Sequence, residues 1–292
     1  MKKSSDIPVA MICLLPSIII FGLFNIFPVL YSGYLGLNRW DGLKRTIEFI
    51  GIQNYRDIIK SIEFWNSMKV TFYYMVGITF FGIAAGLIIA LLLNRKFPGQ
   101  TIFRTIYFTP VITSTIAAAI VWKYLFDPGS GYINTFLRFF RVPGPGWLTS
   151  PTWAMPVIIT MGVWKRLGFN MVIYLAGLQS ISPEYYEVAQ VDGAGSIVRF
   201  FRITLPLISP ITGMLVIMSV IDSFLVFDQI FVMTNGGPLH STDVIGLLLY
   251  RNAFRYFKLG YSSAIGMIIF MVIFIITFLQ RRFLSSGEKA LW

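Results

Sequence analysis

The sequence contains six long apolar runs, and five of them carry no charged residue. A helix needs about 20 apolar residues to cross the ~30 Å hydrocarbon core of a bilayer. The runs are continuous, whereas the strands of a transmembrane barrel alternate apolar and polar residues. We therefore predict an all-α integral membrane protein with six transmembrane helices, at residues 7–38, 70–94, 105–122, 153–182, 203–221 and 259–280.

The first run follows Lys2 and Lys3, as the apolar part of a signal peptide would. It is too long for a signal peptide and no small-residue cleavage site interrupts it, so we expect a retained first span. The single cysteine, Cys13, excludes an intramolecular disulfide and a cysteine-based metal site. The net charge of +11 comes from basic residues that border the runs, which indicates contact with membrane lipid and not with nucleic acid.

The basic residues also predict an orientation. The short segment 94–104 has three basic residues and no acid, whereas the segments that follow the first run mix both signs. Because positive charge in short loops marks the cytoplasmic side, we expect cytoplasmic N- and C-termini in a multi-pass protein of a bacterial-type inner membrane. This orientation puts residues 181–210 in the cytoplasm.

Residues 181–210 form a polar segment between two apolar runs. Ser182-Pro183-Glu184 is a helix start, with a hydroxyl at the N-cap, proline at the first position and an acid near the positive helix end. Gly193 and Gly195 end this helix, and Ser196 caps a second one. Two short helices at an angle would form a cytoplasmic projection. From the pattern alone, the projection is either an interfacial loop that joins two spans or a docking element.

The spacing Glu187-x-Ala189-x3-Gly193-x9-Ile203-x-Leu205-Pro206 resembles the EAA motif of binding-protein-dependent ABC importer permeases, with Val188 in place of the central alanine. Residues 49–74, 168–181 and 227–242 are also similar to that family. The chain resembles its type I, carbohydrate-uptake branch, which includes maltose and glycerol-phosphate permeases. The resemblance covers nearly the whole chain.

The resemblance implies a type I permease core at residues 67–281. Residues 1–66 would hold the first helix and an extracytoplasmic helical loop, and 282–292 a cytoplasmic tail. Residues 182–206 would couple the chain to a separate ATPase subunit, with Glu187 facing a basic partner residue, Ala189 permitting close approach and Gly193 letting the two short helices cross tightly. The residues expected in this coupling role are Glu187, Ala189, Asp192, Gly193, Ala194, Ile203, Leu205 and Pro206.

The resemblance also implies partners: a second homologous permease chain, two ATPase subunits and an extracytoplasmic substrate-binding protein. The binding protein would face the segment Asn235, Gly236, Gly237 and Pro238. The sequence has no G-x-x-x-x-G-K-[ST] loop, and a lone His240 cannot form a two-histidine metal site. We expect no catalytic residue, no metal and no cofactor on this chain, with ATP and magnesium bound by the partner ATPase.

Ionisable and polar groups within spans are costly and often functional. Lys165 and Arg166 interrupt the fourth run, and Arg166, Asn170 and Tyr174 recur every four residues on one helix face. Ser219 and Asp222 share a face of the fifth predicted helix, with Asp222 just beyond the end of the run. These two stripes would line a substrate pathway. Alternatively, the groups pair with one another as structural contacts, for example Lys165 with Asp222.

The predicted function is the membrane-spanning permease subunit of an ATP-driven importer for a carbohydrate or related polyol. An ion-coupled secondary transporter is the alternative, although the sequence shows no internal repeat. A membrane scaffold would lack the polar stripes of the fourth and fifth runs. The sequence does not identify the sugar, and it leaves neutral and anionic substrates open.

Overall fold

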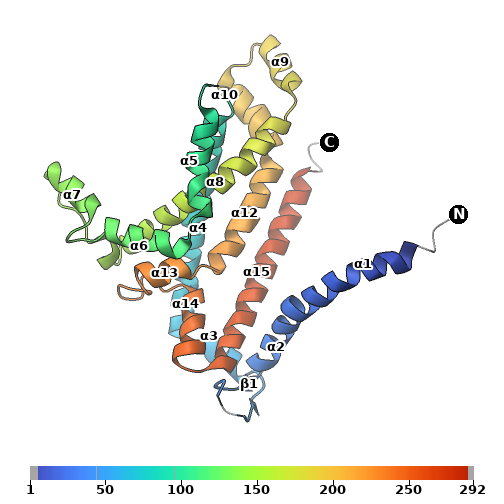
Figure 1. Cartoon of the computed structure of the whole chain (residues 1–292), viewed down its shortest axis with the longest axis vertical. Helices are drawn as coiled ribbons and strands as arrows, with labels where there is room; N and C mark the ends of the chain where they lie inside the picture. The colour runs from blue at the N-terminus through green and yellow to red at the C-terminus, as the bar shows by residue number, and fades with distance from the viewer. Residues whose placement is uncertain (1–5, 44, 96, 289–292) are drawn as a thin grey trace. The chain divides into compact units, whose positions relative to one another are not determined.

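The computed structural model describes residues 6–43, 45–95 and 97–288, which are mostly helical (Figure 1). The chain forms two compact units. Unit 1 consists of Met1–Phe64 and Leu248–Val272, and unit 2 of Trp65–Leu247 and Ile273–Trp292.

Unit 1 joins the N-terminal helices to a small hairpin. Its elements are α1 (Asp6–Phe21), a π-helical turn (Gly22–Ile26), α2 (Phe27–Gly36), β1 (Asn38–Arg39), β2 (Glu48–Phe49), α3 (Gln53–Lys60), a π-helical turn (Arg251–Arg255) and the first part of α15 (Leu259–Glu288). The two strands are antiparallel, with Asn38 opposite Phe49. The buried amide of Asn54 donates to the carbonyl oxygens of Gly36 and Asn38, both at 2.9 Å, and so holds α3 against the end of α2.

Unit 2 contains the longest helices and a series of short ones. Its elements are α4 (Ile62–Leu93), α5 (Gln100–Ile112), α6 (Thr115–Leu125), α7 (Tyr132–Phe139), a 3₁₀ turn (Trp147–Thr149), α8 (Ala154–Ser180), α9 (Pro183–Val191), α10 (Ser196–Arg199), a π-helical turn (Phe200–Thr204), α11 (Leu205–Leu207), α12 (Ser209–Phe224), α13 (Asp228–Met233) and α14 (Ile245–Tyr250). Within this unit, α9 and α10 lie at one end of α8, while α6 and α13 lie towards its other end (Figure 1).

Helix α8 is the centre of unit 2. Met171, Tyr174, Leu175 and Leu178 pack in one cluster with apolar residues of α4 and α12. Glycines bring the helix backbones close together. A Cβ atom added at Gly86 would lie 2.5 Å from the Cβ of Asn170, and one at Gly168 would lie 2.7 Å from the Cα of Phe108. Both contacts are closer than side chains permit, so these positions require glycine.

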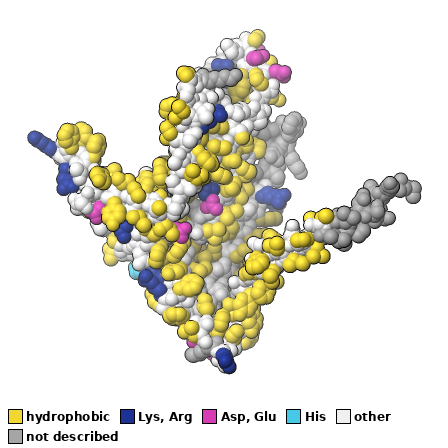
Figure 2. Space-filling model, in the orientation of Figure 1, with side chains coloured by type: hydrophobic (Ala, Val, Ile, Leu, Met, Phe, Trp, Pro, Cys, Tyr) yellow, Lys and Arg dark blue, Asp and Glu magenta, His cyan; other side chains and the backbone are white. Residues whose placement is uncertain are grey.

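Three helical segments are long and apolar enough to cross a membrane: Cys13–Gly36, Ile62–Leu93 and Leu259–Arg282. Two bent pairs raise the number to five if each is one span. The described residues thus confirm a mostly helical membrane protein, but helix length does not fix six crossings. Helix α8 is not among these helices, and Lys165 and Arg166 lie at its centre. Apolar side chains are exposed along the helices (Figure 2), as expected for surfaces in contact with lipid.

The runs predicted at 105–122 and 203–221 are not straight helices. The first is broken between α5 and α6, which meet at 99°, because Thr113 has extended backbone angles and Ser114 becomes the N-cap of α6. The second is bent by 61° at Ile208, immediately before α12. Prediction from charge-free length treats each run as one rod and does not detect these bends.

Candidate functional site

The predicted helix start at Ser182 is present. Ser182 is the N-cap residue of α9 and Pro183 is its first residue, although the serine side chain makes no capping hydrogen bond. The second predicted cap is displaced by one residue. Gly195 is the N-cap of α10 and Ser196 is its first residue.

Gly193 and Gly195 have different conformations. Gly193 has φ +75°, which L side chains rarely adopt, whereas Gly195 has φ −65°. A Cβ atom at either glycine would meet nothing within 4 Å. Gly193 is therefore required for the turn itself. The predicted reason, a tight crossing of the two short helices, is wrong within this chain because the space around Gly193 is open.

The loop of residues 182–206 presents an apolar and acidic surface. Helix α9 has no buried residue, and Glu187 and Asp192 are exposed. Val188, Val191, Ile197 and Phe201 are between 60% and 88% exposed. Acidic side chains are visible at this end of unit 2 in Figure 2. Large exposed apolar side chains beside charges are typical of a protein–protein contact surface.

The base of the loop is fixed by contacts that sequence reasoning missed. The hydroxyl groups of Tyr186 and Thr204 are 3.0 Å apart and join α9 to the turn before α11. The amide of Ala194 donates to the carbonyl of Ala189 at 2.8 Å and closes the turn at Gly193. Ile203, Leu205 and Pro206 are half-buried at the base. The loop is thus a folded projection with a hydrogen-bonded base.

A cavity of about 450 Å³ with both polar and apolar lining lies within unit 2, between α4, α5, α8, α12 and α13. Lys165, Arg166 and Asp222 line it, as three of the predicted pathway residues. Arg166 and Asp222 form an ion pair across it. The pair considered from the sequence, Lys165 with Asp222, is not the one that forms.

Lys165 instead holds the bend between α5 and α6. Its ammonium group donates to the carbonyl oxygens of Pro110 at 3.1 Å and Thr113 at 2.6 Å. The carbonyl groups at a helix end have no partner within the helix and carry partial negative charge, so a cation is favourable there. Lys165 therefore both lines the cavity and stabilises the break in the predicted third run.

The structure does not bring Asn170, Tyr174 or Ser219 to this cavity. Asn170 is 1% exposed, and its amide donates to the Gly82 carbonyl of α4 at 2.9 Å. Tyr174 is fully buried and donates to Thr212 at 3.0 Å. Ser219 is bonded to Thr79 at 2.9 Å. The regular spacing on α8 is real, but part of that face packs against neighbouring helices.

Two cavity residues were missed by sequence reasoning. The side-chain amide of Gln229, in α13, donates to the hydroxyl of Tyr74, in α4, at 2.7 Å, and both residues line the cavity. Tyr74 lies inside an apolar run and Gln229 lies beside the charged Asp228. Neither position carries a periodic signal that would have indicated a shared site.

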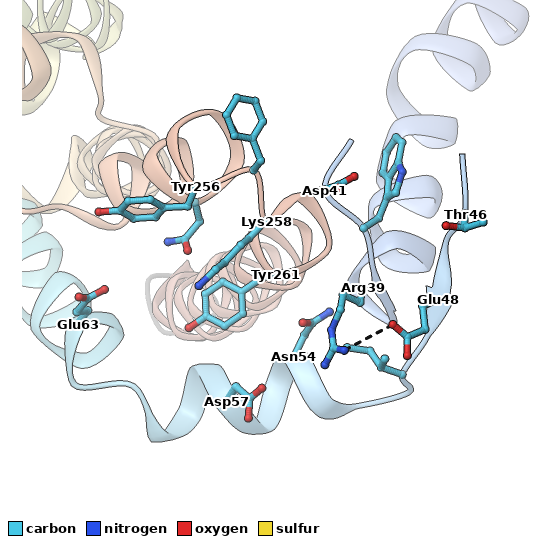
Figure 3. A pocket seen from close by; sticks show the side chains of 14 residues that line it. Arg39, Asp41, Thr46, Glu48, Asn54, Asp57, Glu63, Tyr256, Lys258 and Tyr261 are labelled. Atoms are coloured by element: carbon cyan, nitrogen blue, oxygen red, sulfur yellow. Dashed lines mark ion pairs between the residues drawn. The ribbon is translucent and has the colours of Figure 1, made fainter. Parts of the chain in front are cut away.

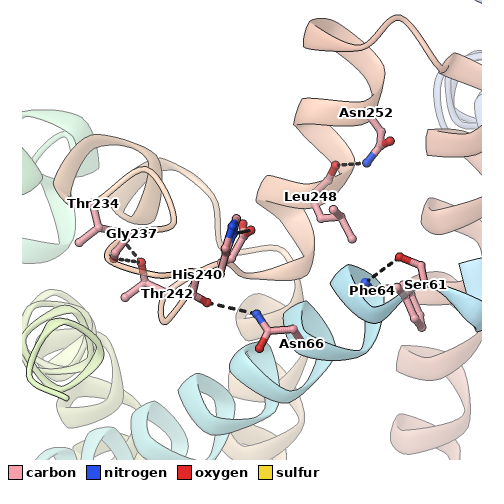
Figure 4. Close-up of polar contacts among 10 residues, drawn as sticks. Ser61, Phe64, Asn66, Thr234, Gly237, His240, Thr242, Leu248 and Asn252 are labelled. Atoms are coloured by element: carbon pink, nitrogen blue, oxygen red, sulfur yellow. Dashed lines mark hydrogen bonds and ion pairs between the residues drawn. The ribbon is translucent and has the colours of Figure 1, made fainter. Parts of the chain in front are cut away.

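The segment Asn235, Gly236, Gly237 and Pro238 belongs to a folded loop at the end of unit 2 that carries α13. Thr242 donates to the Gly237 carbonyl at 2.7 Å, and Asn66 donates to the His240 carbonyl at 3.2 Å (Figure 4). Leu239 projects from the loop and is 86% exposed. The loop therefore presents a defined surface at the end of unit 2 away from α9.

The turn after α6 borders the same loop. A cavity of about 330 Å³ lies between them, lined by Lys123 and Asp127 on one side and Thr234 and Pro238 on the other. The N–H and hydroxyl groups of Ser130 donate to the Asp127 carboxylate and lower its pKa, with a further bond from the N–H of Gly129. The turn is therefore held by an ionised carboxylate at neutral pH.

Comparison with known proteins identifies the class. Residues 82–287 match the family described as binding-protein-dependent transport system inner membrane component, and the chain belongs to this family. It is a permease subunit of the ABC importer type and not itself an ATPase subunit.

Two sequence relatives show the similarity over nearly the full length. The trehalose/maltose transport system permease protein MalF of Thermococcus litoralis is 34% identical over 278 residues, covering 93% of this chain and 92% of that protein. The multiple sugar-binding transport system permease protein MsmF of Streptococcus mutans is 32% identical over 267 residues, covering 91% of each chain.

Solved structures show the same architecture. A bacterial ABC transporter involved in import of the acidic polysaccharide alginate contains a chain that is 26% identical, with a TM-score of 0.83 and 95% of each chain covered. The same kind of transporter has been solved in complex with an alginate pentasaccharide-bound periplasmic protein, with a TM-score of 0.84, 26% identity and 96% coverage of each chain.

Proposed function

We propose that this chain is the membrane-spanning subunit of an ATP-driven importer that carries a carbohydrate or related polyol delivered by an extracytoplasmic binding protein. The exposed loop of residues 182–206 is the observation that carries the proposal. A transporter that works without a separate ATPase subunit has no need of a folded, apolar projection next to its membrane helices. The names of the relatives, which refer to sugars, support the substrate class.

The ATPase subunit would bind the projection formed by α9 and α10. Val188 and Val191 would enter an apolar cleft of the partner, and the exposed carboxylate of Glu187 would meet a basic residue there. The hydrogen-bonded base at Tyr186 and Thr204 would transmit movement of the ATPase to α12. ATP and magnesium would be bound by two ATPase subunits, and a second permease chain would complete the complex.

The proposed topology has six crossings and cytoplasmic N- and C-termini. It counts the pair α5 and α6 as one span, the pair α11 and α12 as another, and α8 as the sixth. The arrangement within unit 2 supports opposite sides of the membrane for the two surfaces, because α9 and α13, which precedes the second loop, lie towards opposite ends of α8 (Figure 1). The second surface would face the extracytoplasmic binding protein.

The proposed substrate pathway passes the cavity of unit 2. Lys165, Arg166 and Asp222 would line it together with Tyr74 and Gln229. Asn170, Tyr174 and Ser219 are not part of this pathway, since each is buried and hydrogen-bonded to a neighbouring helix. Arginine, carboxylate, amide and phenol groups can all bond to the hydroxyl groups of a sugar.

The test is reconstitution of the complete complex. The chain would be co-expressed with its candidate second permease, ATPase and binding protein, purified by a tag on the permease, and placed in proteoliposomes. We expect the ATPase to co-purify, and one or more of maltotriose, trehalose, raffinose and cellotriose to accumulate when ATP is supplied. Accumulation of an amino acid or an inorganic ion, but of no saccharide or polyol, would refute the substrate class.

A further inference from the structure

Unit 1 contains a cavity that no predicted role uses. It has a volume of about 950 Å³ and lies between the β1–β2 hairpin, α3 and the segment that leads into α15 (Figure 3). Cavities of ~300–1,000 Å³ are the usual size of small-molecule sites. In the proposed topology the hairpin and α3 follow the first span, so the cavity opens on the extracytoplasmic side.

The walls of the cavity are held by backbone bonds. The N–H of Gly260 donates to the carbonyl of Trp40 at 3.1 Å, which ties the start of α15 to the hairpin. The N–H of Lys258 donates to the backbone carbonyl of Asn252 at 2.8 Å. Because the first of these bonds joins distant parts of the chain and the second fixes the local turn before α15, the cavity is formed before any ligand arrives, which lowers the entropic cost of binding.

Two buried amides form part of the lining. Asn54 is 7% exposed and Asn252 is 5% exposed. The Nδ2 group of Asn54 bonds to the carbonyls of Gly36 and Asn38, and that of Asn252 bonds to the carbonyl of Leu248 at 2.9 Å. Their nitrogen atoms are thus used within the protein, and each amide offers its oxygen as an acceptor. Figure 3 shows Asn54 between Tyr261 and Arg39.

Carboxylates add further acceptors around the amides. Those that line the cavity are Asp41, Glu48, Asp57 and Glu63. Glu48 pairs with Arg39 at 3.5 Å, and Asp41 and Asp57 each accept a hydrogen bond from within the protein, so these three keep only part of their acceptor capacity for a ligand. An ionised carboxylate only accepts hydrogen bonds, so a wall of this kind favours a ligand with many donors. Arg39 and Lys258 are the cations of the lining, which leaves an excess of negative charge. That excess repels anionic ligands.

Aromatic rings complete the lining. Trp40, Tyr256 and Tyr261 face the same cavity, and Lys258 lies beside Tyr261 (Figure 3). Aromatic side chains offer apolar faces with a polar group at the edge. A sugar ring has a complementary form, because its C–H groups make an apolar face and its hydroxyl groups surround the rim as donors.

The geometry points to a second saccharide-binding site, on the extracytoplasmic side of unit 1, that binds a neutral or amino oligosaccharide and excludes acidic ones. The choice of a saccharide among donor-rich ligands rests on the proposed function. The site is separate from the cavity of Lys165 and Arg166, which belongs to unit 2, and it would hold sugar near the membrane surface before transfer.

The test measures binding by calorimetry to the full chain in nanodiscs, without the binding protein. The probes are maltotriose, raffinose and cellotriose as neutral saccharides, trigalacturonate as an acidic one and spermidine as a cation. We expect at least one neutral saccharide to bind, and Tyr256→Ala and Glu63→Gln each to weaken it about tenfold. The matched controls Tyr132→Ala and Glu184→Gln, which lie outside the cavity, should leave it unchanged.

Several results would overturn the inference. These are no binding of any neutral saccharide, equal binding by cavity and control variants, stronger binding of trigalacturonate, or binding of spermidine alone. ATP-driven uptake by the complete complex is measured in parallel. If a saccharide accumulates but the cavity variants bind and transport like wild type, the second site is refuted and the proposed function stands. If no saccharide or polyol accumulates, the proposed function fails by itself.

Discussion

At the scale of single residues, the polar groups of α8 separate into two kinds. Arg166 reaches Asp222 across a cavity, whereas Asn170 lies one turn further along and bonds to a carbonyl of α4. The first kind has room for a ligand and the second has none. The two kinds predict different consequences when the side chain is removed.

Replacing Arg166 and Asp222 should have non-additive effects on the free energy of unfolding and a separate effect on transport. Arg166→Leu and Asp222→Leu should each lower the free energy of unfolding, and the double variant should recover about 1 kcal/mol, because Asp222 is more than half exposed. Uptake should stay low in the double variant if Arg166 contacts substrate. Thermal unfolding in detergent and ATP-driven uptake measure the two quantities. Strictly additive effects on unfolding would show that the pair contributes nothing.

Asn170→Leu should act on folding and not on substrate affinity. The change removes a buried hydrogen bond and adds bulk against Gly86, at a cost of about 1–3 kcal/mol in the free energy of unfolding. Thermal unfolding checks this cost, and uptake per folded complex should stay near wild type. The control is Val172→Leu, on an exposed face of the same helix. If Asn170→Leu unfolds like wild type but loses uptake, Asn170 does belong to the substrate pathway.

At the scale of elements, the sequence predicted where helices form better than it predicted how they bend. Charge-free length locates α4 and α15 because each is one uninterrupted apolar helix. Charge-free length could not locate the break at Thr113. The side chain that bonds to the Thr113 carbonyl is that of Lys165, which lies 52 residues away in the sequence. Gly82 and Gly86 were an available signal that α4 approaches another helix closely, and so that Asn170 packs there.

The coupling loop gives an element-scale prediction with a matched pair of glycines. Gly193→Ala should cost about 1–2 kcal/mol, because φ +75° is unfavourable for an L residue. Gly195→Ala should be nearly neutral, since its φ is −65° and the space around it is equally open. Co-purification with the ATPase and uptake should both fall for Gly193→Ala alone. If both variants co-purify with the ATPase and transport equally well, the conformation of the turn at Gly193 is not needed for coupling.

At the scale of the whole molecule, family membership follows from the match over residues 82–287, while the orientation in the membrane is a proposal. The sequence alone predicted the family because the EAA-like spacing lies within one short segment and can be recognised without the structure. The sequence alone could not predict the cavity of unit 1, since its walls come from the hairpin near residue 40 and from the start of α15, more than 200 positions later.

Labelling from each side of the membrane tests the orientation. In a Cys13→Ala background, Ser196→Cys should react with an impermeant thiol reagent only from the cytoplasmic side. Leu239→Cys, at an 86% exposed position, should react only from the outside. The signal should be at least severalfold above that of the cysteine-free chain. Reversed labelling would invert the topology and remove the argument for an ATPase at α9.

The central claim is that a separate ATPase drives transport through this chain, and energy dependence tests it most directly. Proteoliposomes that contain the complete complex would be loaded with ATP and magnesium, and saccharide uptake would be followed after ionophores have collapsed the proton and sodium gradients. We predict uptake that continues without either gradient and stops when the catalytic glutamate of the ATPase subunit is replaced. Uptake that requires an ion gradient and proceeds without ATP would contradict the claim and identify an ion-coupled transporter.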